Sequence, residues 1–152
     1  WRPHKRLDEN IRYFLEHSGP KDGMIVAGGV SPDQKIKDDK IHYVGTLTQK
    51  QLFSLYKKSK FFIHLAWLDH CPNVVVDARA CGAQIICSSA GGTKEIAGSD
   101  AIIIQEDVWN FKPTALYEPP SMDFANKLQV GLDSELDMNV VCEKYRDFIF
   151  GD

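Results

Sequence analysis

Five short apolar runs, separated by segments with helical spacing, most constrain what this chain can fold into. The runs cover residues 24–27, 41–44, 61–65, 84–88 and 101–104. Each run is almost continuously apolar, which is typical of strands buried on both faces rather than strands with one solvated face. Such strands in alternation with helices predict an α/β fold, in which helices cover both faces of a parallel sheet.

The segments between the runs carry helix signals. An apolar stripe over residues 7–15 predicts a first helix, which Gly19 and Pro20 end. Thr48 is typical of a helix N-cap, and the helix after it is expected to end near Lys60. Further helices are expected at residues 74–81, 93–97, 121–132 and 139–150, with a packed loop at 108–120.

Loops that follow the strands contain the candidate binding elements. In parallel sheets ligands bind beyond the carboxyl ends of the strands. Gly28-Gly29, Gly45-Thr46-Leu47, the loop around Asp69 and Gly91-Gly92 all follow predicted strands, so they are expected on one edge of the domain. Gly28-Gly29 lacks the spacing of a dinucleotide fingerprint and is expected to allow close approach by a strand or a ligand. Gly91-Gly92 predicts either a phosphate-binding nest or a plain turn into a helix capped by Thr93.

Two carboxylates, Asp69 and Asp77, stand eight residues apart around Pro72. Asp77 is expected early in a helix and Asp69 in the loop before it. The pair suits a hydroxyl-rich anionic ligand such as a nucleotide sugar, because carboxylates accept hydrogen bonds from hydroxyls and a helix N-terminus attracts phosphate. Alternatively, Asp77 complements the helix dipole and Asp69 forms a local turn.

Four basic side chains gather before the first helix: Arg2, His4, Lys5 and Arg6. Positive charge is unfavourable at the positive end of a helix. The cluster is therefore expected either to meet an anion, such as a diphosphate, or to extend into solvent. His64 lies in the third apolar run, where a buried structural histidine is the simplest interpretation.

Charge and cysteine usage exclude several classes. The formal net charge of −3 argues against nonspecific binding to nucleic acid or a membrane surface. No run is long enough to span a membrane, and no signal peptide is recognisable. Four cysteines lack metal-type spacing; Cys81 and Cys87 are expected to be buried thiols in a reduced, cytoplasmic protein. No motif indicates a metal, a cofactor or a serine nucleophile.

The order of these motifs resembles retaining glycosyltransferases of the GT-B fold, group 1 and family 4-like. Asp69-x7-Asp77 followed by A-R-A-C-G-A-Q-I-I-C-S-S-A-G-G-T-K-E-I resembles that family's E-x7-E, E-A-M-A-C-G and G-G-x-x-E motifs. P-H-K-R-L-D, V-A-G-G, I-H-Y-V-G-T-L and K-Y-R-D-F are similar to further family segments. The resemblance covers nearly the whole chain.

The resemblance implies a Rossmann-like half of a GT-B enzyme that binds the nucleotide-sugar donor, UDP- or GDP-linked, and needs no cofactor. Residues 1–152 are expected to form this one domain. The implied catalytic residues are Asp69, facing the donor sugar, and Lys5, at the diphosphate. The implied donor-binding residues are Asp77 at the ribose, Asn73 and Val74 at the diphosphate, Thr46 and Leu47 at the base, and Gly28 at the V-A-G-G strand end.

Several positions depart from the family pattern. Both acids are Asp where Glu is usual, and Pro72 stands where Gly is common. An Arg usually found five residues before the Lys, a preceding strand and the acceptor domain are expected outside these residues, so the chain alone is expected to be inactive. A non-catalytic nucleotide-sugar-binding or scaffold module is the alternative. A GT-B epimerase or phosphorylase is a third hypothesis, although the A-C-G…G-G-T-K-E run suits transferases better.

Overall fold

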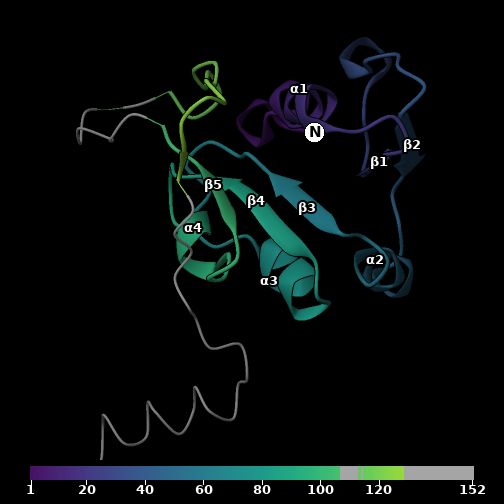
Figure 1. The fold of residues 1–152 in the computed structure, drawn as a ribbon. Coiled ribbons are helices and arrows are strands. Elements are labelled where there is room, and N and C mark those ends of the chain that lie inside the picture. The colour runs from purple at the N-terminus through teal and green to yellow at the C-terminus, as the bar shows by residue number, and fades with distance from the viewer. Residues whose placement is uncertain (107–112, 114, 129–152) are drawn as a thin grey trace, which may run out of the picture.

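The computed structural model describes residues 1–106, 113 and 115–128 (Figure 1). The strands of this part of the chain are β1 (Met24–Ala27), β2 (Ile41–Gly45), β3 (Phe61–His64), β4 (Gln84–Ser88), β5 (Ile102–Ile104) and β6 (Lys127–Leu128). Its α-helices are α1 (Leu7–His17), α2 (Gln49–Tyr56), α3 (Asn73–Ala80) and α4 (Thr93–Ile96). Two 3-10 helices, η1 (Pro3–Lys5) and η2 (Pro32–Gln34), complete the described elements.

The strands form two sheets whose pairing is mainly parallel. β1 pairs with β2 in parallel, with Met24 opposite Ile41. The second sheet has the order β3-β4-β5-β6, in which β3, β4 and β5 are parallel and β6 is antiparallel to β5. The predicted α/β fold with parallel strands is therefore confirmed, and β6 is an addition that the sequence patterns did not predict.

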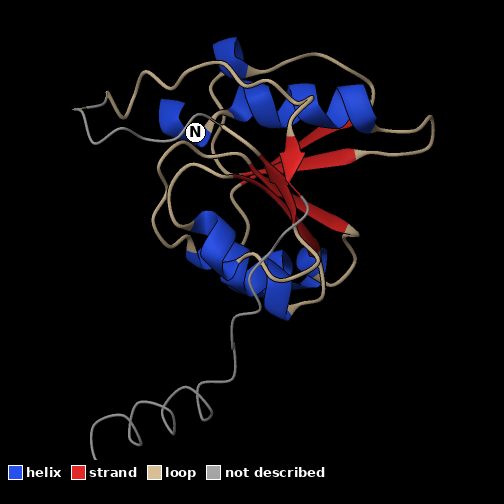
Figure 2. Ribbon diagram, turned by 60° about the vertical axis from the view of Figure 1, so that its left-hand side comes forward, coloured by secondary structure: helices blue, strands red, loops and turns tan. Residues whose placement is uncertain are grey.

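Helices lie on both sides of the strand layer (Figure 2), although Ile25 of β1 and Val44 of β2 are exposed, so these two strands are not buried on both faces as expected. On one face, α1 packs against both sheets: Ile11 belongs to a buried cluster with Val26 of β1, and Tyr13 to a cluster with Ile86 of β4. Burial of a large aliphatic side chain contributes about 1.5–3 kcal/mol, so these clusters hold the two sheets under one helix.

The opposite face of the four-stranded sheet carries α2, α3 and α4 (Figure 1). Tyr56 of α2, Val75 of α3 and Ile85 of β4 share one buried cluster. The rings of Tyr56 and Phe62 meet edge to face with centroids 5.3 Å apart, a favoured aromatic geometry. This packing fixes the start of α3 relative to the end of β3.

Helix α2 confirms Thr48 as an N-cap. The Thr48 hydroxyl accepts from the Gln51 amide, and the Gln51 side chain accepts from the Thr48 amide at 2.9 Å, which completes a capping box. The helix ends at Tyr56, before the predicted end near Lys60. The reason is a tightened last turn, in which the Lys58 amide donates to the carbonyl of Leu55 at 3.0 Å.

The helix predicted at residues 121–132 is wrong over its described part. Met122 and Phe124 are both buried against β3, β4 and β5 residues, and this two-residue spacing suits an extended chain. The Gln105 amide donates to the carbonyl of Asn126 at 2.8 Å, and β6 then pairs with β5. The second closing helix, at 139–150, lies outside the described residues, as do positions 108–112 and 114 of the predicted loop.

The two cysteines expected to be buried, Cys81 and Cys87, differ in their exposure to solvent. Cys87 in β4 is buried, and burial raises the pKa of its thiol to about 12. Cys81, directly after the last residue of α3, packs against the core cluster but is only half-buried.

Candidate functional site

The candidate site forms where η1 meets the loop that follows β3. The Trp67 amide donates to the carbonyl of His4 at 2.7 Å, which fixes η1 against this loop. Lys5, at the end of η1, makes an ion pair through Nζ with Oδ2 of Asp69. The structure thus brings together the two residues predicted to be catalytic, although 64 positions separate them in the chain.

His64 is a third member of this cluster. Its ring nitrogen Nε2 lies 2.9 Å from Oδ2 of Asp69, the oxygen that Lys5 also contacts. The hydrogen bond from His64, together with the bond and positive charge of Lys5, holds the pKa of Asp69 well below its usual range. His64 is buried, as expected, but it is bonded to the candidate site rather than purely structural.

The backbone of Asp69 is held by the loop after β4. The Gly92 amide donates to the Asp69 carbonyl at 2.9 Å, and the Thr93 hydroxyl approaches the same oxygen at 3.4 Å. A Cβ at Gly91 would overlap the Asp69 backbone, and one at Gly92 would overlap the His70 carbonyl. The two glycines therefore permit close packing of two loops at the carboxyl edge of the sheet.

Two sequence predictions about nearby helices are corrected. Thr93 does not cap α4: the N-cap is Gly92, because the Thr93 hydroxyl is directed to the Asp69 carbonyl. Asp77 does not lie early in its helix, since α3 begins at Asn73, directly after Pro72, and its first turn contains no acidic residue. The interpretation of Asp77 as a partner of the helix dipole therefore loses its support.

Asp77 is half-buried and faces α2. Its charge, after burial itself, is the next cause that raises the pKa of Tyr56 to about 12. Asp77 and Asp69 thus lie in different environments, and no contact joins them within the described residues. The ionised carboxylate of Asp69 accepts hydrogen bonds from Lys5 and His64, whereas Asp77 has no ion pair in this part of the chain.

The first turn of α3 presents exposed groups beside this loop. Asn73 and Val74 are exposed, and Pro72 provides no side-chain cap. The first hydrogen bond of the helix joins the Val75 amide to the Pro72 carbonyl at 2.9 Å. The amides of Asn73 and Val74 have no partner among the described residues, as in the first turn of α-helices in general, and such amides are able to bind an anion.

The remaining predicted residues follow β1 and β2, the strands of the two-stranded sheet. Thr46 is exposed and Leu47 half-buried. Gly28 has φ +104°, and its open side faces the indole of Trp1, whose Nε1 donates to the Ala27 carbonyl at 3.1 Å. The close approach expected at Gly28 is therefore made by Trp1. No contact links Thr46, Leu47 or Gly28 to Asp69 among the described residues.

Arg6 and Glu106 form a buried ion pair that sequence reasoning missed. Arg6 is 1% exposed; its Nη2 lies 2.7 Å from a carboxylate oxygen of Glu106 and 2.8 Å from the Pro120 carbonyl. The Ser88 hydroxyl, at the end of β4, donates to the same carboxylate. The basic cluster thus meets carboxylates of its own chain through Lys5 and Arg6. No local pattern indicates a pair separated by 100 positions.

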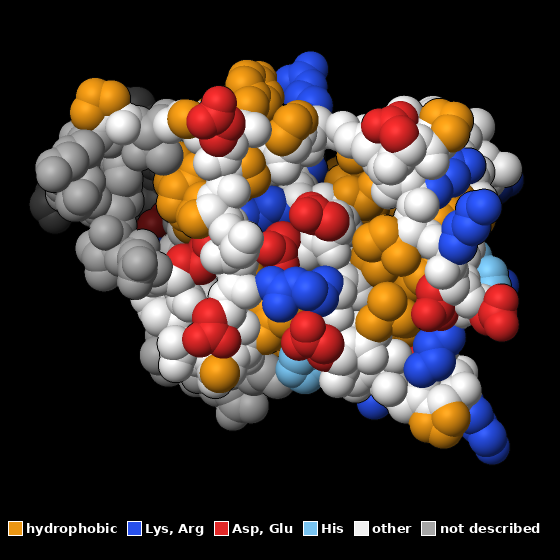
Figure 3. Space-filling model, turned by 90° about the horizontal axis from the view of Figure 1, so that it is seen from above, with side chains coloured by type: hydrophobic (Ala, Val, Ile, Leu, Met, Phe, Trp, Pro, Cys, Tyr) orange, Lys and Arg blue, Asp and Glu red, His pale blue; other side chains and the backbone are white. Residues whose placement is uncertain are grey.

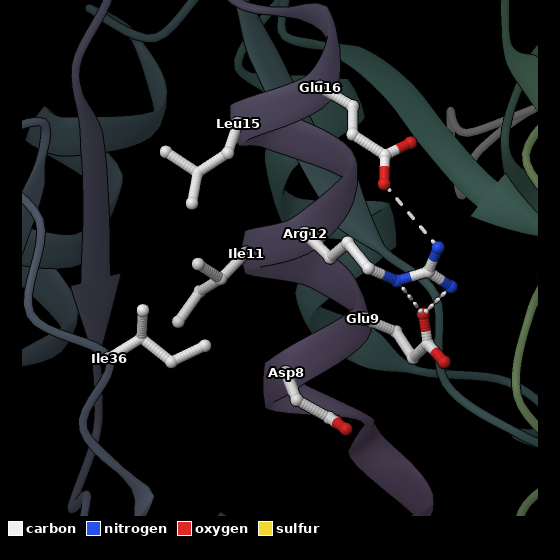
Figure 4. Close-up of a pocket in the computed structure, with 7 residues that line it drawn as sticks. All are labelled: Asp8, Glu9, Ile11, Arg12, Leu15, Glu16 and Ile36. Atoms are coloured by element: carbon white, nitrogen blue, oxygen red, sulfur yellow. Dashed lines mark hydrogen bonds and ion pairs between the residues drawn. The ribbon is translucent and has the colours of Figure 1, made fainter.

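A groove of about 470 Å³ lies elsewhere, between α1 and the segment around Ile36. In Figure 4, Arg12 points to Glu9 and Glu16, while Ile11 and Leu15 lie on the side toward Ile36. No residue predicted for the site lines this groove. Among the described residues, the face that carries α1 shows acidic and basic side chains interspersed (Figure 3).

Comparison with protein families identifies the class of this fold and site. Residues 5–116 match the family described as Glycosyl transferases group 1. The match covers well over half of the chain and includes every residue that the sequence predicted for the candidate site. The chain therefore belongs to the group 1 glycosyltransferases, enzymes of the GT-B family, and membership implies a nucleotide-sugar donor.

No curated protein matches the chain. Within the described residues, no helix is both long and apolar enough to cross a membrane.

Proposed function

We propose that this chain is the donor-binding half of a retaining glycosyltransferase of the hexosyltransferase type, which takes a UDP- or GDP-linked sugar. The observation that carries the proposal is the cluster of Lys5, His64 and Asp69 at the carboxyl edge of the parallel strands. This edge is where ligands bind in open α/β sheets. The family membership of residues 5–116 supports the same chemistry.

Each polar group has a proposed role. Asp69 accepts hydrogen bonds from hydroxyls of the donor sugar, and Asp77 accepts them from the ribose. Lys5 and the amides of Asn73 and Val74 hold the diphosphate. Thr46 and Leu47 contact the base through their backbone, and Gly28 borders the site beside Trp1.

Sugar transfer leaves negative charge on the diphosphate as the bond to the anomeric carbon breaks. A fixed ammonium group and helix amides stabilise such charge because they need no reorganisation during the reaction. Packing of η1 places Lys5 at this site, and its ammonium group turns from Asp69 to the diphosphate when the donor binds, before the bond breaks. We propose that Lys5 and the first turn of α3 offset this charge together.

We further propose that these residues work with a second, acceptor-binding domain and are inactive alone. Free sheet edges support a larger assembly: within the described residues, β1 pairs only with β2, and β3 pairs only with β4. Unpaired strand edges are templates for another strand. The free thiols of Cys71, Cys81 and Cys87 fit the proposed cytoplasmic location.

Isothermal titration tests the donor site. The chain is titrated with UDP, GDP, UDP-glucose and GDP-mannose, and we expect saturable binding of one nucleotide class. Asp77→Ala is expected to weaken binding of the nucleoside diphosphate more than Asp69→Ala does. Asp39→Ala, at an exposed turn, is the matched control and is expected to leave binding unchanged.

Two results would contradict the proposal. A folded chain that binds none of these compounds has no donor site, and the donor-binding role then fails. If Asp69→Ala weakens binding of the nucleoside diphosphate more than Asp77→Ala does, the roles of the two acids are wrongly assigned.

A non-catalytic nucleotide-sugar-binding module is the second candidate. Pro72 is buried at the N-cap of α3 and has no amide hydrogen to offer a sugar, and both acids are one methylene shorter than Glu. A protein with both domains that binds the donor but neither hydrolyses nor transfers it would favour this candidate. Measurable transfer to an added acceptor would exclude it.

A further inference from the structure

His64 is the most rigidly held side chain in the cluster around Asp69. It is the last residue of β3, lies opposite Cys87 of β4 and is 8% exposed. Its ring stacks on Phe62, with centroids 6.1 Å apart and planes 14° from parallel. Strand pairing fixes the backbone of His64 and the stacked ring limits its rotation, so Nε2 has a defined position before any ligand arrives.

The bond from His64 leaves one oxygen of Asp69 for a ligand. A carboxylate only accepts hydrogen bonds, so Nε2 of His64 carries the hydrogen and donates it. Both His64 and Lys5 contact Oδ2. Oδ1 has no partner among the described residues and remains able to accept from a hydroxyl group.

Lys5 is less suited than His64 to fix this carboxylate. Its side chain is 31% exposed, against 17% for Asp69, and an ammonium group on a long stem moves readily toward a phosphate. A diphosphate beside η1 would compete with Asp69 for Nζ of Lys5. The bond from His64 does not face that competition, because its ring is buried between β3 and the Asp69 loop.

We propose that His64 is a positioning residue, which holds Oδ2 of Asp69 so that Oδ1 meets the donor sugar while Lys5 serves the diphosphate. This inference rests on the proposed donor site. If His64 has this role, two properties of the site are separable. Selection of the sugar depends on His64, which acts through Asp69, whereas affinity for the diphosphate does not depend on His64.

The test compares affinities for the nucleoside diphosphate and its sugar derivative, using UDP with UDP-glucose and GDP with GDP-mannose. His64→Leu removes the N–H donor and keeps an apolar side chain of similar bulk. We expect the affinity for the sugar derivative relative to the diphosphate to fall about tenfold, since a hydrogen bond to a charged group is lost. The Kd of the diphosphate is expected to stay within about twofold.

Two further variants make the test specific. His64→Gln retains an N–H donor and is expected to recover most of the sugar preference. In an Asp69→Asn background, His64→Leu is expected to have little further effect, because the two residues act as one unit. Thermal denaturation of each variant confirms that it is folded before binding is measured.

The outcomes separate this inference from the proposed function. If His64→Leu is folded and lowers both affinities equally, or neither, His64 is structural and the inference is overturned. The same holds if His64→Leu weakens sugar binding as much in the Asp69→Asn background as in the otherwise unaltered chain. If the unaltered chain binds none of the four compounds, the proposed function fails and the inference falls with it.

Discussion

Asp69 is the residue on which three parts of the chain converge. Lys5 belongs to η1, His64 is the last residue of β3, and Gly92 lies in the loop after β4. Two of these groups bond to its carboxylate and one to its carbonyl. Both the backbone and the side chain of Asp69 are therefore fixed, as a residue that orients a ligand requires.

The hydrogen bond from His64 and the contact with Lys5 make stability depend on pH in a defined direction. The pKa of Asp69 in the folded protein is lowered from its ordinary value of 3.8, so ionised Asp69 stabilises the fold above that value. This stabilisation is lost as pH falls below 3.8 toward the folded-state pKa. Urea denaturation from pH 7 to pH 2 is expected to show Asp69→Asn less stable than the unaltered chain near pH 7.

The difference in free energy of unfolding between the two proteins should narrow as pH falls below 3.8. Asp39→Asn, at an exposed turn, serves as the control and should show no such trend. A difference that stays constant from pH 7 to pH 2 would mean that the folded protein does not lower the pKa of Asp69.

The site was predictable from sequence only in part. The family motifs predicted Lys5 and Asp69 as residues of one site, and the structure joins the two in an ion pair. The contact of His64 was not predictable, because a histidine in an apolar strand is equally consistent with a core position. The corrected position of Asp77 depends on where α3 begins, which Pro72 determines and the apolar run does not.

At the scale of elements, the site depends on two loops that touch. The loop after β3 and the loop after β4 pair through a bridge between Asp69 and Gly91. Their strands are parallel neighbours, so both loops leave the sheet at the same edge. The bridge therefore continues the parallel pairing of β3 and β4 into the loops that form the site.

Gly92→Ala is expected to disrupt this contact. The added Cβ would overlap the His70 carbonyl, and neither backbone can move freely. We expect a loss of about 2 kcal/mol in the free energy of unfolding, measured by urea denaturation. Gly29→Ala is the matched control, since a Cβ there has no neighbour within 4 Å, and its effect should stay within about 0.5 kcal/mol. Equal effects would show that the two loops are not tightly packed.

The elements themselves were largely predictable. Continuous apolar runs predicted β1 to β5; the reason, that buried parallel strands need no polar face, holds best for the central strand β4 and not for β1 and β2, where Ile25 and Val44 are exposed. The antiparallel strand β6 was missed, since a two-residue strand carries no recognisable period and depends on its pairing with β5. The helix predicted at residues 121–132 is wrong over residues 121–128, where the burial of Met122 and Phe124 determines the conformation.

At the scale of the whole molecule, Arg6 joins parts that are distant in sequence. Its guanidinium contacts Glu106 after β5, the Leu65 carbonyl after β3 and the Pro120 carbonyl. It also lies 5.0 Å from the ring centroid of Trp67. The residue adopts a left-handed conformation, φ 51°, between η1 and α1, so its position also determines how Lys5 enters the site.

Arg6→Met is expected to destabilise the fold strongly. Loss of the guanidinium leaves the buried carboxylate of Glu106 unpaired, which costs about 3–5 kcal/mol. Chemical denaturation measures the change. Arg2→Met, at an exposed position near the start of the chain, should change the free energy of unfolding by no more than about 0.5 kcal/mol. Similar values for the two variants would mean that the ion pair of Arg6 contributes little.

The proposed donor site is tested most directly by locating the residues at which a nucleoside diphosphate binds. Amide chemical shifts of the ¹⁵N-labelled chain are followed during titration with UDP and with GDP. We expect the largest changes at Lys5, Asn73 and Val74, and smaller ones at Thr46 and Leu47. Changes confined to the groove lined by Asp8, Arg12 and Ile36, or no changes from a folded chain, would contradict a donor site at the carboxyl edge of the sheet.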